Sequence, residues 1–211
     1  MKKALLISLA LILTFVLASA GWYYYKMKAT PSKRNVARSV NSTLIKELHS
    51  KADGLLAYAK ANQCNTSICF LIDMKIESGK NRFFIYDMKR DSVLDASLVT
   101  HGRCNERWLN GRKYGNEPGC GCTSLGKYKI GNPYQGRFGL AYKLFGLDNT
   151  NSNAFKRFVV LHSHGCVPNT EVDPYPICQS DGCPTVSKPF LKKLAGILDS
   201  SEKPVLLQIY E

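Results

Sequence analysis

A histidine and a cysteine stand where a nucleophile and its base would stand. His162 ends the apolar run Arg157-Phe-Val-Val-Leu-His162, and Cys183 follows 21 residues later in Ser180-Asp-Gly-Cys-Pro184. A free thiol has a pKa of roughly 8.5 and is mostly protonated near neutral pH. A neighbouring imidazole favours the thiolate and can return the proton to a leaving amine. The spacing favours cysteine-dependent chemistry, and a pair of metal ligands or a histidine beside a disulfide would give a similar pattern.

Both helices and strands must position these residues, because the apolar residues of the sequence recur with two different periods. Apolar residues recur at helical spacing over 44–62 and again over 188–198, where Ser187 and Pro189 mark the start of a helix. Between these two helices and after the second, apolar residues recur with a period of two, which is typical of short strands. The strands are expected at 69–73, 82–86, 97–100, 126–130, 138–142, 157–162 and 205–209. The pattern predicts a mostly β domain of α+β class.

The beginning of the chain indicates export. Residues 1–25 combine Lys2 and Lys3, an uncharged apolar run and the triplet Ala18-Ser-Ala20, as in a signal peptide. The uncharged stretch is also long enough for an uncleaved membrane anchor over residues 4–25. Either interpretation predicts an extracytoplasmic protein, periplasmic or in the cell envelope. Residues 26–43 are basic and poor in apolar side chains, which predicts a linker.

Composition limits the class of protein. The chain has 211 residues, of which 45% are hydrophobic and 10% aromatic, so it can bury a core and most of it is not disordered. This length suits one domain, or one domain with an appendage. The net charge of +13 favours association with anionic polymers in general, and a solvated basic surface explains it equally well.

The region around His162 and Cys183 resembles the L,D-transpeptidase catalytic-domain family (YkuD-like), in its murein L,D-transpeptidase branch. The family pattern is a strand ending in Val-Ile/Leu-His, then Ser-x-Gly-Cys-Pro before a helix. The resemblance covers about residues 66–210 and includes further motifs in the same order. These motifs are Leu71-Ile-Asp73, His101-Gly102, Asn116-Glu-Pro-Gly119, Thr123-Ser-Leu-Gly126, Gly136-Arg-Phe-Gly-Leu140, Leu144-Phe-Gly-Leu147 and Asn153-Ala154 with Arg157.

This resemblance implies a fold and a reaction. The fold is a β-sandwich or barrel-like catalytic domain over 66–211, with the N-terminal helix and a late helix after the cysteine. The reaction is attack on the diaminopimelate carbonyl of a peptidoglycan stem tetrapeptide, loss of D-alanine, and acyl transfer to an amine or to water. The resemblance implies no cofactor, no metal and no nucleic-acid partner, and we expect a monomer. The alternatives are a cysteine peptidase or amidase on another substrate, and an inactive wall-binding module with a disulfide-bonded Cys183.

The resemblance also assigns roles to residues. Cys183 is the expected nucleophile, His162 the general base and then acid, and Ser180 a residue that positions the loop and the imidazole. Gly182 and Cys183 would supply oxyanion donors. Substrate-binding residues are expected at three positions in the upstream motifs, namely Asn116, Ser124 and Arg157.

Two features depart from the family pattern. Asp181 places a negative charge beside the thiol, where other side chains are common in the family, and this charge disfavours the thiolate. Ser163-His-Gly-Cys166 offers a second candidate nucleophile. We prefer Cys183 because the helix and final strand that follow the nucleophile in the family come after Cys183 and not after Cys166.

The other seven cysteines cannot all pair with one another if Cys183 is free. We expect disulfides between Cys64 and Cys69, between Cys166 and Cys178, and between Cys104 and either Cys120 or Cys122. A competing hypothesis is a zinc site built from His101, Cys104, Cys120 and Cys122.

Overall fold

The computed structural model describes Thr14, Ala18, Ser19 and residues 42–211. Apart from those three residues and the last two of the linker, the signal peptide or anchor expected at 1–25 and the linker expected at 26–43 lie outside the described residues. Within the described part of the chain, no helix combines the length and the apolar character needed to span a bilayer.

The folded domain begins with an amphipathic helix, α2, which runs over Ser42–Ala61. Its buried residues Leu48, Ala52, Leu55 and Ala59 recur every three or four positions and form one apolar face. The sequence predicted a helix over 44–62, and the helix begins two residues earlier.

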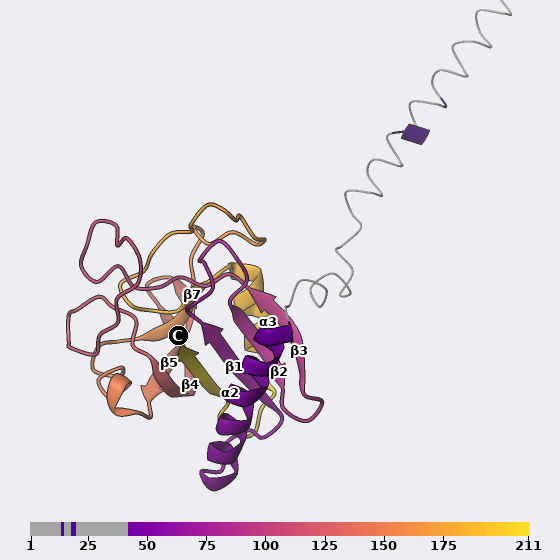
Figure 1. Cartoon of the computed structure of the whole chain (residues 1–211), viewed down its shortest axis with the longest axis vertical. Helices are drawn as coiled ribbons and strands as arrows, with labels where there is room; N and C mark the ends of the chain where they lie inside the picture. Colours follow the sequence, from indigo (N-terminus) through magenta and orange to yellow (C-terminus); the bar gives the residue numbers. More distant parts are fainter. Residues whose placement is uncertain (1–13, 15–17, 20–41) are drawn as a thin grey trace, which may run out of the picture. The chain divides into compact units, whose positions relative to one another are not determined.

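One eight-stranded sheet forms the body of the domain, in the order β3-β2-β1-β8-β4-β5-β6-β7 (Figure 1). The strands β1 and β8 pair in parallel, as do β6 and β7, and the other neighbours are antiparallel. The last strand of the chain, β8, lies between β1 and β4, so it connects strands β1 to β3 with strands β4 to β7 in one sheet. The strands are β1 Ile68–Asp73, β2 Phe83–Asp87, β3 Ser92–Ser97, β4 Gly126–Gly136, β5 Gly139–Gly146, β6 Val160–Ser163, β7 Thr185–Val186 and β8 Leu206–Tyr210.

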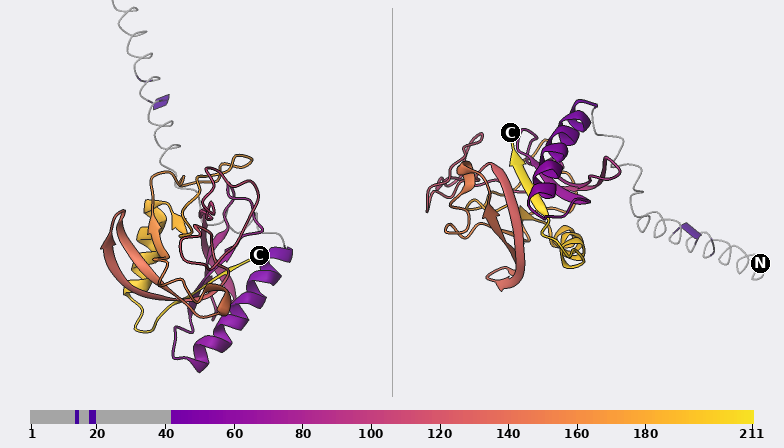
Figure 2. Two further views of the ribbon diagram at one scale, coloured as in Figure 1. Left: turned by 90° about the vertical axis from the view of Figure 1, so that its left-hand side faces the viewer. Right: turned by 90° about the horizontal axis from the view of Figure 1, so that it is seen from below.

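The two faces of the sheet contribute to two cores. Along β1, Phe70 and Ile72 belong to the larger core, which includes the buried face of α3 (Lys188–Asp199). Cys69 and Leu71 alternate with them and belong to the core that α2 covers. Figure 2 shows the two helices packed against different parts of this sheet. The mostly β class with two helices is therefore confirmed.

The strand expected at 97–100 is wrong. The strand in this region is β3, and Ser97 is its last residue. The residues that follow bond to other partners: the carbonyl of Val99 accepts hydrogen bonds from the buried guanidinium of Arg82, and the N–H of Thr100 donates to the carbonyl of Thr185. The segment after β3 thus joins a buried arginine to the strand beside the cysteine.

We expect Leu55→Ala to lower the free energy of unfolding by about 2–5 kcal/mol, because its side chain is fully buried between α2 and the sheet. The neighbouring Gly54→Ala is the matched control, since a Cβ there meets nothing within 4 Å. It should raise the same free energy by about 0.5–1 kcal/mol through helix propensity. Denaturant unfolding measures both, and equal effects would contradict the packing of α2 on the sheet.

Candidate active site

His162 lies on β6, between two neighbouring strands. Its backbone is opposite Ala141 of β5 and Thr185 of β7. The imidazole Nδ1 is 3.1 Å from the carbonyl oxygen of Ser163, which can only accept, so Nδ1 carries the proton. Nε2 is then the unprotonated nitrogen, and it accepts a hydrogen bond from the hydroxyl of Thr185 at 3.0 Å. This is the tautomer that a general base at Nε2 requires.

Cys183 lies in a closed turn just before β7. Its carbonyl accepts hydrogen bonds from the hydroxyls of Ser180 at 2.7 Å and Thr100 at 3.1 Å, and the Thr185 hydroxyl is 3.3 Å away. The N–H of Gly182 donates to the Ser180 hydroxyl at 3.2 Å. Ser180 therefore shapes the turn around the cysteine. The N–H of Gly182 is used inside this turn, whereas the N–H of Cys183 has no hydrogen-bond partner among the described residues.

Gly182 is required by both its backbone conformation and its surroundings. Its φ is +104°, in a region that residues with a Cβ rarely adopt. A Cβ at this position would lie 2.6 Å from the carbonyl oxygen of Cys122. Only glycine allows the two segments to approach this closely.

The Cys122 segment is held by Arg157. The guanidinium donates to the carbonyl of Cys122 at 2.5 Å, to the carbonyl of Gly115 at 2.9 Å and to the hydroxyl of Ser124. Asn116 bonds instead with Asn149, Ser152 and Asn153. The three positions expected to bind substrate thus make hydrogen bonds within the protein, and substrate contact there stays a prediction. The structure brings Ser124 and Arg157 together, and the Arg157 guanidinium lies next to Gly182.

Two phenylalanines flank the cysteine and histidine, and the sequence did not single them out. Phe138, in the β4–β5 turn, is 50% exposed and stacks on the His162 imidazole with ring centroids 5.0 Å apart. Phe158 is 83% exposed, has a φ of +56°, and its carbonyl oxygen is 3.8 Å from Cys183 Sγ. A bulky residue in this conformation is strained, and such strain is concentrated at functional sites.

Burial keeps both reacting groups neutral at rest. It raises the pKa of the Cys183 thiol above its ordinary value, against the smaller opposing effects of a backbone hydrogen bond from Val160 and the Arg157 charge. Burial also lowers the pKa of His162. The thiol bonds to the Phe158 carbonyl and Nε2 to the Thr185 hydroxyl, rather than to each other. The resting pair is a thiol and a neutral imidazole.

Asp181 shifts the pKa of the Cys183 thiol in the predicted direction, but its effect is smaller than that of burial. Its charge raises the pKa of Cys183, and burial of the thiol is the largest cause of that rise. The carboxylate points to Arg103, with Nε and Oδ1 2.7 Å apart, on the exposed side of the loop. This ion pair partly balances the negative charge beside the thiol.

The disulfides distinguish the two candidate nucleophiles. Cys166 is bonded to Cys178, as expected, so its sulfur is not a free nucleophile. Cys183 is free, which contradicts the inactive alternative in which it is disulfide-bonded. The expected Cys64–Cys69 disulfide is wrong, because both are free thiols that pack as apolar residues in the core under α2.

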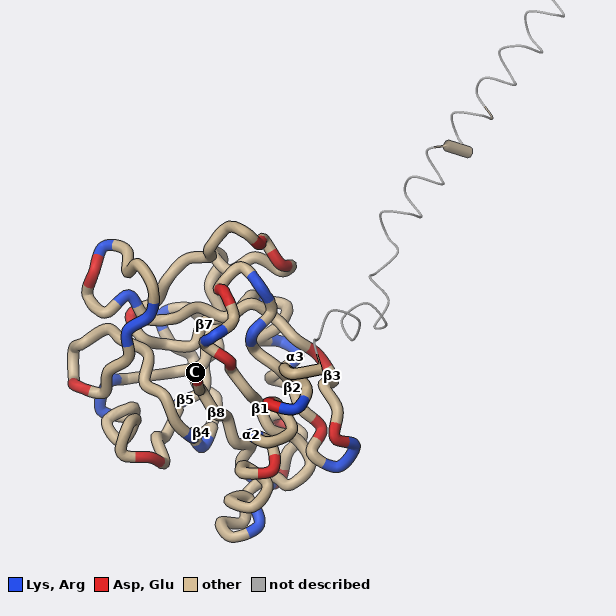
Figure 3. The backbone as a smooth tube through the Cα atoms, in the orientation of Figure 1, with Lys and Arg blue, Asp and Glu red and all other residues tan. Residues whose placement is uncertain are grey.

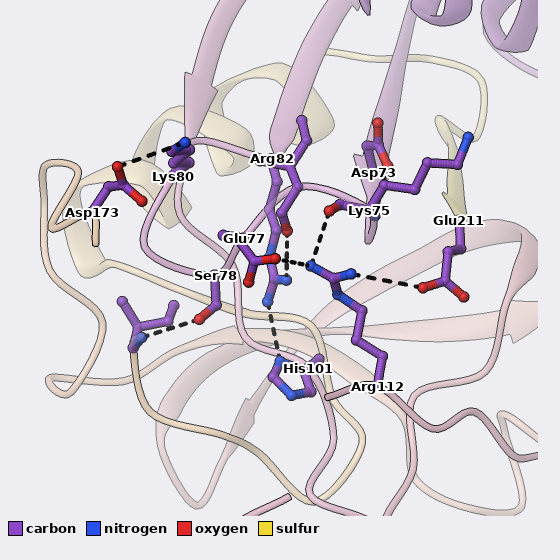
Figure 4. A network of polar contacts seen from close by, with 12 residues as sticks. Asp73, Lys75, Glu77, Ser78, Lys80, Arg82, His101, Arg112, Asp173 and Glu211 are labelled. Carbon is purple, nitrogen blue, oxygen red and sulfur yellow. Dashed lines mark hydrogen bonds and ion pairs between the residues drawn. The ribbon is translucent and has the colours of Figure 1, made fainter. Parts of the chain in front are cut away.

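The zinc hypothesis is also contradicted. Cys104 and Cys122 form the second disulfide, which selects one of the two expected pairings and uses two of the four proposed ligands. His101 is buried and accepts a hydrogen bond at Nδ1 from Arg82 at 3.3 Å (Figure 4). Burial and the Arg82 charge lower the pKa of His101 to about 4, so its ring is neutral.

The network around Arg82 supports the turn that contains Cys183. Figure 4 shows its guanidinium directed at His101, with Arg112 placed between Glu77 and Glu211. The carbonyl of His101 accepts a hydrogen bond from the N–H of Ser180 at 2.9 Å. The network therefore fixes both Thr100 and Ser180, the two residues whose hydroxyls bind the Cys183 carbonyl.

The site therefore combines a free cysteine, in a turn that requires glycine, with a histidine of defined tautomer on a mostly β sheet. These are the residue types that cysteine-dependent catalysis uses. The sequence matches the family described as L,D-transpeptidase catalytic domain over residues 39–207. The chain therefore belongs to the L,D-transpeptidase catalytic domain family, whose members act on the cell wall. No curated protein matches it.

Solved structures with related folds are distant. An Enterococcus faecium L,D-transpeptidase C442S mutant is 12% identical with a TM-score of 0.43, covering 68% of this chain and 50% of that one. Helical cell shape determining protein Pgp2 from Campylobacter jejuni is 16% identical with a TM-score of 0.42, covering 77% and 56%. The chain thus spans about half the length of these proteins, and the family assignment rests on the sequence match.

We expect Gly182→Ala to lower the free energy of unfolding by about 1–3 kcal/mol, because the Cβ would collide with the Cys122 carbonyl. Gly119→Ala is the control, since Gly119 shares a positive φ but a Cβ there meets nothing within 4 Å. In denaturant unfolding, Gly119→Ala should lower the free energy of unfolding by less than half as much as Gly182→Ala. Equal losses would show that backbone strain alone, and not the close approach of the two segments, requires glycine at 182.

We expect iodoacetamide to alkylate Cys183 slowly at pH 7 and faster as the pH rises, with a midpoint above that of a free thiol, because the raised pKa keeps the thiol protonated. His162→Asn should leave this profile unchanged, since the resting imidazole does not hold the thiol proton. Alkylation followed by peptide mass spectrometry measures the rate. A fast rate that is independent of pH down to pH 6 would indicate a thiolate–imidazolium pair and contradict this description.

Proposed function

We propose that this protein is an extracytoplasmic L,D-transpeptidase or L,D-carboxypeptidase acting on peptidoglycan stem peptides through a Cys183 thioester. One observation supports the proposal above the others: the free Cys183 lies two residues before Thr185, the strand partner of His162, whose Nε2 is unprotonated. The family match supplies the substrate class, and the segment over 1–25 supplies the export signal or anchor.

The first half-reaction forms the thioester. The thiol leaves the Phe158 carbonyl, its proton passes to His162 Nε2, and Sγ attacks the diaminopimelate carbonyl of the stem tetrapeptide. The unpaired N–H of Cys183 donates to the developing oxyanion. The C–N bond to D-alanine breaks as the imidazolium returns its proton to the leaving amine.

The second half-reaction releases the acyl group. An amine of another stem, or water, attacks the thioester while His162 Nε2 takes its proton. The C–S bond breaks and the Cys183 sulfur leaves as a thiolate, which His162 reprotonates. The Ser163 carbonyl holds Nδ1–H throughout, so the same nitrogen serves as base and acid in both halves.

We expect Cys183→Ala to abolish release of D-alanine from a disaccharide tetrapeptide, and His162→Ala to lower it by about 10²–10⁴-fold through loss of general-base catalysis. Cys120→Ser is the matched control, because Cys120 is a free thiol outside the turn. It should keep the wild-type rate, measured by mass spectrometry of the products. Undiminished D-alanine release by Cys183→Ala would refute the assigned nucleophile.

We expect the rate of D-alanine release by the wild type to fall as the pH is lowered. Protonated His162 cannot accept the thiol proton, so activity is lost on acidification. Because burial lowers the pKa of His162, the midpoint of this loss should lie below the ordinary histidine value of 6.5.

A further inference from the structure

An open groove begins beside the catalytic histidine and continues along α3. Its volume is about 800 Å³, which is within the range of sites that hold small molecules or peptide segments. The lining includes Phe138, Leu140, His164, Lys188, Leu191 and Lys192. Neither Cys183 nor His162 lines it, but Phe138 and Ser163, which both contact the His162 ring, do.

Phe138 joins the groove to the catalytic histidine. Its ring stacks on His162 and is perpendicular to the ring of His164, with centroids 5.4 Å apart. Ser163, whose carbonyl binds His162 Nδ1, also lines the groove. A ligand in the groove therefore lies on the histidine side of the catalytic pair.

The groove is apolar at its base and cationic at its rim. Leu140, Leu191 and Ala195 line it, and no aspartate or glutamate is among its described lining residues. Lys188 and Lys192 are four positions apart on α3 and both exposed, so they lie on the same side of the helix.

The position of Lys188 is unusual for a helix. A cation in the first turn opposes the helix dipole, and α3 has no acidic residue there. Neither lysine pairs with a carboxylate in the described chain, whereas the next lysine, Lys193, pairs with Asp95 at 2.6 Å. The two groove lysines are thus available to an external anion.

We infer that this groove binds the acyl acceptor, an amine-bearing stem peptide whose carboxylates are held by Lys188 and Lys192. The inference rests on the proposed function. His162 must take a proton from the acceptor amine, so the acceptor approaches from the histidine side. The amine nitrogen forms the new C–N bond, the thioester C–S bond breaks, and the amine proton passes through His162 to the Cys183 sulfur. Water needs no such groove, so the groove favours cross-linking over hydrolysis.

The test uses two acceptors with a disaccharide tetrapeptide donor. One is a diaminopimelate tripeptide with free carboxylates, and the other is the same tripeptide with its carboxylates amidated. The readout is cross-linked product per D-alanine released, which separates acceptor use from thioester formation. We expect the wild type to prefer the free carboxylates by about fivefold or more at low salt, with less preference at high salt.

The variant Lys188→Gln/Lys192→Gln should use both acceptors equally and shift its products toward hydrolysis. Lys193→Gln is the matched control, on the same helix but outside the groove, and it should keep the wild-type preference. The double variant should unfold at the wild-type temperature or slightly above it, because it removes a cation from the helix N-terminus.

Two outcomes would overturn the inference while the proposed function stands. One is normal D-alanine release with no acceptor preference in the wild type, including release by hydrolysis alone. The other is a preference that persists in the double variant. Absence of D-alanine release by the wild type would instead refute the proposed function, and the acceptor groove with it.

Discussion

The parallel pairing of β6 with β7 determines the geometry of the whole site. It sets Thr185 opposite His162, and so brings Cys183, two residues earlier, to the end of the histidine strand. A shift of one residue would turn the Thr185 hydroxyl to the other face of the sheet and leave His162 Nε2 without its partner. The pair is only two residues long, so its register depends on supports outside it, chiefly the hydroxyl of Thr100 and the antiparallel neighbour β5.

A disulfide and a hydrogen-bonded arginine add further constraints next to the turn. The disulfide between Cys104 and Cys122 ties the segment after Thr100 to the segment whose carbonyl faces Gly182. Arg157 holds the same carbonyl from the other side. Because an oxidised cysteine pair contributes to this frame, the fold suits a compartment in which disulfides persist. Along the backbone of the domain, Lys and Arg positions are interspersed with Asp and Glu positions (Figure 3).

Burial favours the neutral forms of the Cys183 thiol and the His162 imidazole. A neutral thiol and a neutral imidazole cost less to bury than an ion pair would, and each has a neutral hydrogen-bond partner at rest, the Phe158 carbonyl and the Thr185 hydroxyl. Two exposed side chains lie next to these groups, Phe138 against the imidazole and Phe158 near the thiol. On the side of Phe138, the groove along α3 is lined by two lysines, Lys188 and Lys192, that form no ion pair within the described chain.

The sequence by itself determined the elements whose signals are local. Helical periodicity predicted α2 and α3, and the strand pattern predicted β1, β2, β4, β5, β6 and β8. The motif around Cys183 predicted a loop that Ser180 helps to position. Only the tertiary structure decided the rest, including the two-residue β7, the absence of a strand at residues 98–100 and the free thiols of Cys64 and Cys69. Each of these depends on contacts between residues far apart in the chain. Periodicity and spacing carry no information on such contacts, because they describe only neighbours along the sequence.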